Sequence, residues 1–323
     1  MLFDMPLEEL QEYLPARNEP SNFDDFWIGT LQETNAFSID TTMKEVDFGL
    51  KTLTTYDVSF RGFAGHPIKG WFLIPKHIQK PIPCVIEYIG YGGGRSLPID
   101  WLLWSSTGYA HFIMDTRGQG SQGKFGDTPD LCNEPSPPQY PGFMTKGIND
   151  PELYYYRRVF TDAARAVQAV KEISTVDPTR VALTGSSQGG GIALAANGLV
   201  KDISALLVDA PFLCHYRRAV TITDKMPYNE IALYCKTHRD KVERIFHTLD
   251  YFDGMNFAAR GKANALFSVG LMDMVCPPSS VFAAYNHYAG KKQIKVWTFN
   301  EHEAGGTQHK IEQIKFLAEL WGN

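Results

Sequence analysis

Apolar residues along most of this chain form short continuous runs, and helical patterns separate them. Such runs are typical of strands in a parallel sheet that helices cover on both faces, because neither face of the strand meets water. The helical patterns include 161–170 (TDAARAVQAV) and 310–321 (KIEQIKFLAELW). The apolar runs lie at 84–89, 110–114, 181–184, 205–208, 265–269 and 294–299. The pattern predicts an α/β fold with a mostly parallel, twisted sheet flanked by helices.

Four segments depart from this rhythm. Residues 43–75 alternate between apolar and polar positions, which predicts two or three antiparallel strands. Residues 1–40 predict an N-terminal helical extension that packs its aromatic side chains on the body, and 121–150 is a long loop rich in Pro and Gly. Residues 211–260 lie between two predicted strands and are helical and aromatic, which suits a small cap. We predict one domain over residues 1–323.

Size and charge restrict the class of ligand. The 323 residues are 44% hydrophobic, enough to bury the core of one large domain. The formal net charge is −5 and no cluster of basic residues stands out, so neither a nucleic acid nor a membrane is an expected partner. The acidic N-terminus lacks the basic region and apolar run of a signal peptide, and no stretch approaches a membrane span. We expect a cytoplasmic protein with small uncharged substrates.

Five cysteines are scattered along the chain without a CxxC pair, as is usual for proteins of a reducing compartment. We expect them to pack as small apolar residues, including Cys276, which follows a candidate catalytic acid by three positions. The histidines and cysteines show no metal-ligand spacing, so we expect neither a metal nor a cofactor. The cysteines are Cys84, Cys132, Cys214, Cys235 and Cys276.

Ser187 is the candidate nucleophile. It is the central residue of a GxSxG motif, Gly185 to Gly189, which follows the apolar run 181–184 and precedes a helix-forming segment. This strand, turn and helix context is that of a nucleophile elbow, in which a sharp turn exposes the serine hydroxyl to a histidine. The glycines on either side leave space for the turn because they lack a Cβ atom. The alternative is a structural turn rich in glycine.

The acid and the base are expected downstream, at the carboxyl ends of later strands. Asp273 follows the run at 265–269, and His302 follows the run at 294–299. The order Ser, Asp, His is that of α/β-hydrolases, with His302 accepting the serine proton and Asp273 orienting the imidazole. Asp209 also ends a strand and is the rival acid. The rival histidines, which we expect to be packed or solvated, are His215, His238, His247, His287 and His309.

A tetrahedral oxyanion needs two hydrogen-bond donors. The first is expected to be the backbone N–H of Gln188, which follows the nucleophile at the start of a helix. We assign the second to the N–H of Tyr91 in the loop GYGGGR (90–95), with Gly92 as the alternative. Tyr91 is also expected to line the substrate pocket together with Trp104, Phe212 and Val275.

These motifs together resemble the acetyl xylan esterase and cephalosporin C deacetylase family of carbohydrate esterases. The matching segments are DTRGQG (115–120), GSSQGG (185–190), GLMDMVCPP (270–278), HE (302–303), PGFMTKGI (141–148), YYYRRVFTDA (154–163), GWFLIP (70–75) and FDDFW (23–27). The resemblance implies an α/β-hydrolase fold and a serine esterase. It also implies that the enzyme removes acetyl groups from xylo-oligosaccharides and cephalosporin C.

The resemblance implies further features by position. Ser187, Asp273 and His302 take the triad roles, and Tyr91 and Gln188 the oxyanion roles. Arg117 and Gln119 belong to an RGQ motif that supports the nucleophile turn without reacting. A cytoplasmic homohexamer, a trimer of dimers, is implied as well, with 121–150 as an interface loop. After His302 and Glu303 the chain has AGGTQH where relatives tend toward more glycine, so the histidine loop is expected to differ slightly.

Two other functions fit the same fold. A peptidase of the prolyl oligopeptidase type shares the triad order but usually has a large N-terminal domain, and only about 80 residues precede the parallel sheet here. A binding protein could retain the hydrolase fold without the chemistry. An intact Ser, Asp and His in sequence order favours the esterase.

Overall fold

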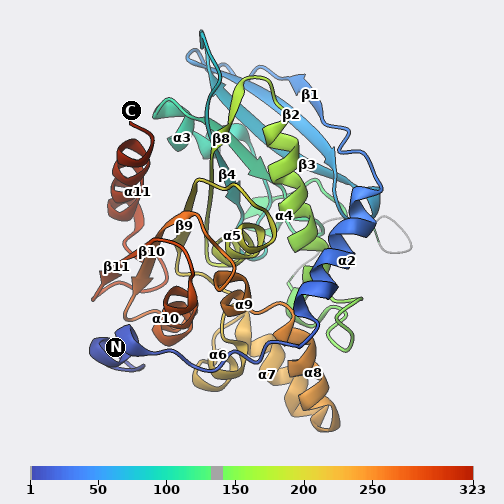
Figure 1. Cartoon of the computed structure of the whole chain (residues 1–323), viewed down its shortest axis with the longest axis vertical. Helices are drawn as coiled ribbons and strands as arrows, with labels where there is room; N and C mark the ends of the chain where they lie inside the picture. The colour runs from blue at the N-terminus through green and yellow to red at the C-terminus, as the bar shows by residue number, and fades with distance from the viewer. Residues whose placement is uncertain (1, 132–140, 323) are drawn as a thin grey trace.

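A nine-stranded sheet forms the centre of the computed structural model, which describes residues 2–131 and 141–322 (Figure 1). The strand order is β1-β2-β3-β5-β4-β8-β9-β10-β11. The pairs among β1, β2, β3 and β5 are antiparallel, and every pair from β5 to β11 is parallel. The strands are β1 Thr42–Glu45, β2 Leu53–Arg61, β3 Pro67–Pro75, β4 Ile82–Tyr88, β5 Ala110–Met114, β8 Val176–Ser186, β9 Ala205–Asp209, β10 Asn264–Gly270 and β11 Lys292–Trp297.

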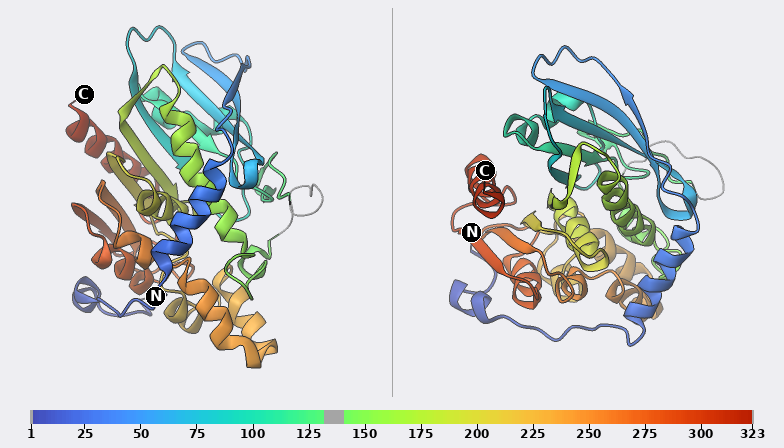
Figure 2. Two further views of the ribbon diagram at one scale, coloured as in Figure 1. Left: turned by 45° about the vertical axis from the view of Figure 1, so that its right-hand side comes forward. Right: turned by 45° about the horizontal axis from the view of Figure 1, so that its top comes forward.

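Helices cover both faces of this sheet (Figure 2). The main core lies under α4 (Tyr155–Lys171), α5 (Gln188–Leu199) and α10 (Pro278–His287). On the opposite face, α3 (Leu103–Ser106) and α11 (Gly306–Trp321) pack in a smaller apolar cluster, and Trp101 and Leu102, just before α3, pack on another. The central strands are buried on both sides, which explains their continuous apolar runs. The predicted α/β-hydrolase fold is confirmed.

The segment 211–260 leaves the sheet after β9 and returns to it at β10. It contains four α-helices and a short 3₁₀ helix, Arg239–Lys241, and Figure 1 shows α6, α7 and α8 extending beyond the end of the sheet. This position places the segment beside the carboxyl ends of the parallel strands. The four helices are α6 Tyr216–Ile222, α7 Tyr228–Thr237, α8 Val242–Asp250 and α9 Gly254–Ala258.

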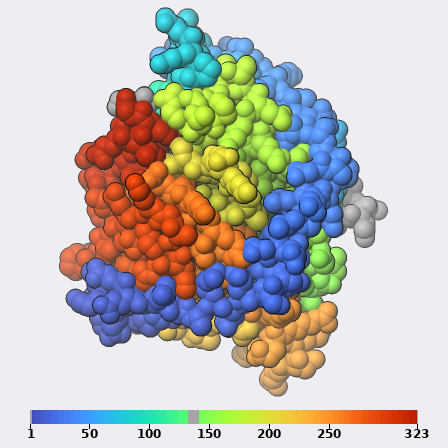
Figure 3. Space-filling view, in the orientation of Figure 1, coloured from blue at the N-terminus to red at the C-terminus, as the bar shows by residue number. Residues whose placement is uncertain are grey.

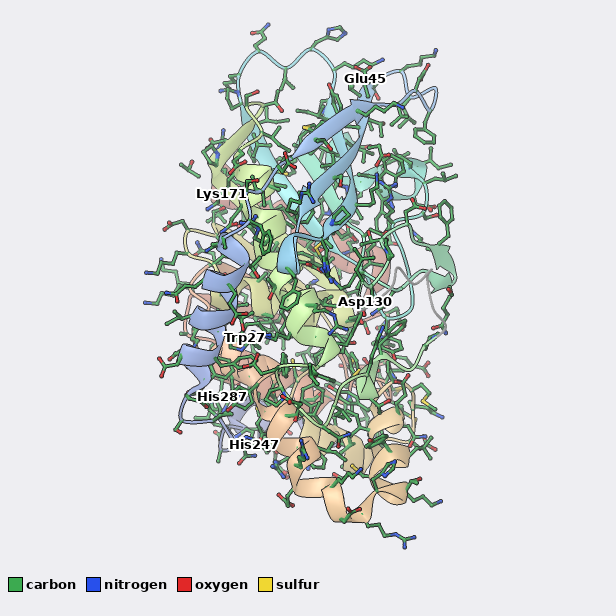
Figure 4. All side chains as sticks on the ribbon, turned by 90° about the vertical axis from the view of Figure 1, so that its right-hand side faces the viewer. Trp27, Glu45, Asp130, Lys171, His247 and His287 are labelled. Atoms are coloured by element: carbon green, nitrogen blue, oxygen red, sulfur yellow. The ribbon has the colours of Figure 1, made fainter. Side chains whose placement is uncertain are left out.

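The N-terminal segment forms two helices, α1 (Leu7–Glu12) and α2 (Phe23–Asn35), and Figure 3 shows it as a band across the lower part of the molecule. Trp27 of α2, labelled in Figure 4, is 2% exposed and packs against aromatic residues of the insertion and of α4. Its indole N–H donates to the carbonyl of Tyr251 at 3.0 Å. The segment therefore contributes to the core.

The remaining long segment, 121–150, begins with a small hairpin of β6 (Ser121–Gln122) and β7 (Lys124–Phe125). A short 3₁₀ helix, Phe143–Thr145, precedes α4. Residues 132–140 of the predicted interface loop lie outside the described residues. None of the helices in the described part of the chain is both long and apolar enough to cross a membrane.

Candidate active site

Ser187 lies at the sharp turn between β8 and α5. Its φ of 56° and ψ of −122° are uncommon for a residue with a side chain and cost on the order of 1–3 kcal/mol. The flanking glycines permit the turn: a Cβ atom on Gly185 would overlap the backbone of Gly189, and one on Gly189 would overlap the carbonyl of Tyr88. The GxSxG motif therefore has the geometry of a nucleophile elbow.

Backbone hydrogen bonds hold the strained turn in place. The Ser187 N–H donates to the carbonyl of Asp209 at 2.9 Å, and the Ser187 carbonyl accepts the N–H of Phe212, also at 2.9 Å. Asp209 is the last residue of β9 and Phe212 follows it, so the strand next to β8 fixes the elbow. The strain is tolerated because these surrounding bonds determine the conformation.

His302 and Asp273 form a hydrogen-bonded pair next to this turn. His302 Nδ1 lies 2.8 Å from Asp273 Oδ2, and the carboxylate must accept this bond, which places the proton on Nδ1. The other carboxylate oxygen accepts the N–H groups of Val275 and Cys276 at 2.7 and 2.9 Å. Asp273 is fully buried, whereas the His302 side chain is 33% exposed. A fixed acid thus orients an accessible base.

Ser187 and His302 line one cavity of about 740 Å³, a volume typical of small-molecule sites. No hydrogen bond joins the two side chains in the described part of the chain, and such bonds often tighten only when substrate binds. Burial, together with the charge of Asp273, raises the pKa of the Cys276 thiol well above its usual range. Cys276 Sγ, a ring nitrogen of His302 and a carboxylate oxygen of Asp273 all lie within 4.8 Å of one another.

The rival acid and histidines lie elsewhere. The Asp209 carboxylate accepts hydrogen bonds from Lys310 and Gln313 of α11 at 2.9 and 2.7 Å, on the face of the sheet that α11 covers. His309 is buried beside it, with its Nε2 atom 3.1 Å from Asp209 Oδ1. Of all histidines in the described ranges, His302 alone lines the cavity. The structure thus brings together Ser187, Asp273 and His302.

Both expected oxyanion donors are available. Within residues 2–131 and 141–322, the backbone N–H groups of Tyr91 and Gln188 make no hydrogen bond to another protein group. The N–H of Gly92, in contrast, donates to Gln119 Oε1 at 2.7 Å. The alternative donor Gly92 is therefore already engaged, and the geometry favours Tyr91.

Gln119 of the RGQ motif connects the loop at Tyr91 with the nucleophile turn. Its amide pairs with that of Gln188 through two hydrogen bonds, Gln119 Nε2 to Gln188 Oε1 at 2.9 Å and Gln188 Nε2 to Gln119 Oε1 at 3.1 Å. Gln188 Nε2 also donates to the carbonyl of Ile89 at 3.1 Å. Because both side chains are buried, this amide pair fixes the two loops relative to each other.

Arg117 of the same motif is fully buried and does not reach the cavity. Its guanidinium binds Asp162 of α4 through two hydrogen bonds, at 2.5 and 2.7 Å. A planar guanidinium is suited to such bidentate binding of a carboxylate. Arg117 therefore joins the loop after β5 to α4.

The side chain of Tyr91 is fixed by residues that sequence analysis did not identify. Its hydroxyl donates to Glu230 Oε1 at 2.7 Å and accepts the N–H groups of Gly142 and Phe143 at 3.2 and 2.9 Å. Glu230 Oε2 accepts the N–H of Met144 at 3.1 Å. Burial raises the pKa of the Glu230 carboxyl. The insertion helix α7 thus reaches the loop that carries the candidate donor.

The expected pocket residues separate into two groups. Tyr91 and Val275 line the cavity, together with Trp101, Met226 and Pro227, among others. Trp104 and Phe212 were expected to line the pocket, and this expectation is wrong. Trp104 packs in the core cluster under α11, and Phe212 is fully buried. Phe212 instead lies behind Tyr91, with ring centroids 6.3 Å apart. Trp101, one turn before Trp104, is the tryptophan that faces the cavity.

We expect Gln119→Leu to lower stability, because it leaves the Gly92 N–H without its partner inside the protein and removes two hydrogen bonds of the Gln188 amide. Each unpaired buried group costs about 1–3 kcal/mol. The midpoint of urea denaturation measures the loss. Gln122→Leu is the matched control, since Gln122 is exposed and its side chain makes no hydrogen bond to the rest of the described chain. Equal shifts of the denaturation midpoint for both variants would show that the Gln119–Gln188 amide pair contributes nothing to stability.

Comparisons with known proteins agree with this geometry. Among solved structures, the acetyl xylan esterase from Paenibacillus sp. R4 is 41% identical, with a TM-score of 0.91 over 98% of this chain and 99% of that one. Acetyl xylan esterase 1 from Thermoanaerobacterium sp. JW/SL YS485 is 33% identical, with a TM-score of 0.88 over 99% and 100%. An acylaminoacyl peptidase from Pyrococcus horikoshii shares only the fold, at 16% identity and a TM-score of 0.59.

The curated acetyl esterase Axe7A from Xylanibacter ruminicola is 23% identical over an alignment of 299 residues that covers 89% of this chain. The aligned part is 64% of that relative, so this chain spans less than two thirds of its length. The sequence model of the acetyl xylan esterase family (AXE1) matches residues 1–320. Together with the similar structures, this match shows that the chain belongs to the acetyl xylan esterase family.

Proposed function

We propose that this chain is a serine carboxylesterase that removes acetyl groups from small acetylated carbohydrates such as xylo-oligosaccharides, and from cephalosporin C. Family membership supports the deacetylating activity. The observation that carries the mechanism is the contact of 2.8 Å between His302 and the buried Asp273, with His302 and the strained Ser187 lining one cavity. This arrangement contains a nucleophile, a base and a group that orients the base.

In the proposed reaction, His302 Nε2 takes the proton of Ser187 as Oγ attacks the acetyl carbonyl carbon. Asp273 keeps the Nδ1 proton in place and stabilises the imidazolium that forms. His302 then gives the proton to the leaving alcohol, and an acetyl-enzyme remains. A water molecule, activated by the same histidine, releases acetate and restores the serine. The N–H groups of Tyr91 and Gln188 stabilise the oxyanion in both steps.

We further infer that Glu230 is a positioning residue for this reaction. It holds the Tyr91 hydroxyl and, through Met144, the segment that also binds that hydroxyl. The Tyr91 backbone N–H is useful only if it points at the oxyanion, and its direction depends on how the residue is held. Glu230 lies on α7, far from Tyr91 in sequence, so its role depends on how the insertion packs.

The competing functions have less support. The acylaminoacyl peptidase shares the fold, but this chain covers only 42% of it. Cleavage of an aminoacyl-proline anilide would favour a peptidase. A binding protein that has lost the chemistry has no need of a strained serine beside a paired histidine, and failure of a fluorophosphonate to label Ser187 would favour that alternative.

Ser187→Ala tests the nucleophile. We expect it to lower kcat for p-nitrophenyl acetate by on the order of 10⁶, as for nucleophile loss in serine hydrolases. The neighbouring Ser186→Ala is the matched control, because Ser186 is more exposed, lines the same cavity and leaves the motif intact. It should retain activity and fluorophosphonate labelling. The proposal fails if Ser187→Ala remains active or if Ser186→Ala alone abolishes labelling.

Asp273→Asn and Asp209→Asn separate the two candidate acids. An asparagine at 273 would stabilise the wrong imidazole tautomer, and kcat should fall by about 10⁴. Asp209 binds α11 through its side chain and holds the elbow only through its backbone, so Asp209→Asn should have a far smaller effect on kcat. Steady-state hydrolysis of p-nitrophenyl acetate measures both. The reverse ranking would reassign the acid.

Glu230→Ala should lower kcat by about 10- to 100-fold with little change in KM, because loss of one oxyanion donor costs about 10²–10³ and a misdirected donor costs less. Glu230→Gln, which keeps one acceptor oxygen, should recover part of the rate. Glu243→Ala is the control, since Glu243 lies on α8 with its side chain 87% exposed.

The losses of activity caused by changes at Tyr91 and at Glu230 should also be non-additive. Tyr91→Phe removes the same contact together with the bonds from Gly142 and Phe143, so the double variant Tyr91→Phe, Glu230→Ala should lose less activity than the two single losses combined. Additive losses would contradict the positioning role of Glu230. So would a fall in activity for Glu243→Ala as large as the fall for Glu230→Ala.

A further inference from the structure

One thiol lies beside the candidate reacting groups and has no part in the proposed reaction. Cys276 is fully buried and free, and its Sγ atom forms a cluster with ligand atoms of Asp273 and His302. These three atoms all lie within 4.8 Å of one another. No other group of three His, Cys, Asp or Glu side chains within residues 2–131 and 141–322 has this proximity.

His302 is already oriented as a metal ligand. Histidines that bind metals usually donate their other ring N–H to a carboxylate, which fixes the ring and raises the basicity of the free nitrogen. The bond from His302 Nδ1 to Asp273 has this form and leaves Nε2 free. Both oxygens of Asp273 are engaged by hydrogen bonds, so the carboxylate acts from the second coordination shell.

The spacing suits a thiophilic cation. Zinc binds sulfur at about 2.3 Å and imidazole nitrogen at about 2.0–2.1 Å, so a tetrahedral site separates the two atoms by about 3.6 Å. Cys276 Sγ lies within 4.8 Å of a ring nitrogen of His302, so the imidazole has to move before Nε2 and the sulfur reach this separation. The His302 side chain is one-third exposed and can make this adjustment. The Ser187 hydroxyl or water in the cavity can complete the coordination.

We propose that His302 Nε2 and Cys276 Sγ together bind a thiophilic divalent cation of the Zn²⁺ and Cd²⁺ class, and that the bound ion inhibits the enzyme. On binding, the thiol loses its proton to solvent and the sulfur forms a bond to the metal, so one proton is released for each ion. The ion occupies the nitrogen that must accept the Ser187 proton. The inhibition rests on the proposed function, whereas the binding does not.

The ion reaches this site from the substrate cavity. His302 lines that cavity, and Cys276 Sγ lies within 4.8 Å of a ring nitrogen of His302. A soft sulfur ligand and an imidazole favour Zn²⁺ or Cd²⁺ over Mg²⁺ or Ca²⁺, which prefer oxygen ligands. The site is therefore expected to discriminate between these two classes of cation.

Titration of the intact chain with Cd²⁺ tests the binding directly, because a cadmium thiolate bond produces an ultraviolet charge-transfer band. We expect the band in the native chain, its loss in Cys276→Ala, and its retention in Cys235→Ser. Cys235 is the matched control, since it is a free, half-buried thiol outside the cavity. Asp273→Asn should weaken Cd²⁺ binding by about 10- to 100-fold, as expected for a second-shell partner.

The second measurement is activity. Cd²⁺ and Zn²⁺, but not Mg²⁺, should inhibit p-nitrophenyl acetate hydrolysis and slow fluorophosphonate labelling of Ser187, with recovery on chelation. Cys276→Ala and Cys276→Ser should both lose this sensitivity, so a folding defect in one variant does not decide the result. A band that persists without Cys276, no band in the native chain, or binding without inhibition would overturn the proposal. A chain without esterase activity that still shows the Cys276-dependent band would refute only the proposed function.

Discussion

The candidate site depends on one strained residue. Ser187 can expose its hydroxyl only in a conformation that is unfavourable in isolation, and the sheet holds it there through the carbonyl of Asp209 and the N–H of Phe212. The nucleophile is thus fixed by the neighbouring strand and by the absence of side chains on the motif glycines. The exposed serine hydroxyl, the backbone N–H of Gln188 and the position that His302 must reach are all set by this turn.

Polar side chains beneath the turn extend the same constraint. The paired amides of Gln119 and Gln188 connect the two donor loops, and Arg117 joins the loop after β5 to α4 through Asp162. Such buried contacts are favourable only when each polar group has a partner, which makes the network intolerant of change. The RGQ motif therefore helps to fix the positions of the reacting groups, although Arg117 does not line the cavity.

Sequence could predict those parts of the fold and site that follow from strand order. Ser187, Asp273 and His302 each follow an apolar run, and parallel strands end at one edge, so their proximity was predictable. The choice between Tyr91 and Gly92 was open in the sequence and depends on where the Gln119 side chain points. Trp101 and Trp104 differ only by the rotation of a short helical segment, which no sequence pattern specifies. Glu230 was missed because a helix pattern does not reveal which distant loop its polar face contacts.

The contact of Trp27 with Tyr251 joins residues 224 positions apart. During synthesis the N-terminal part of a chain emerges first, at about 5–20 residues per second. The aromatic face of α2 must therefore wait for most of the polypeptide before its partner in the insertion leaves the ribosome. Until then Trp27 lacks Tyr251 and Phe252, and Phe160 of α4 is available to cover only part of its ring.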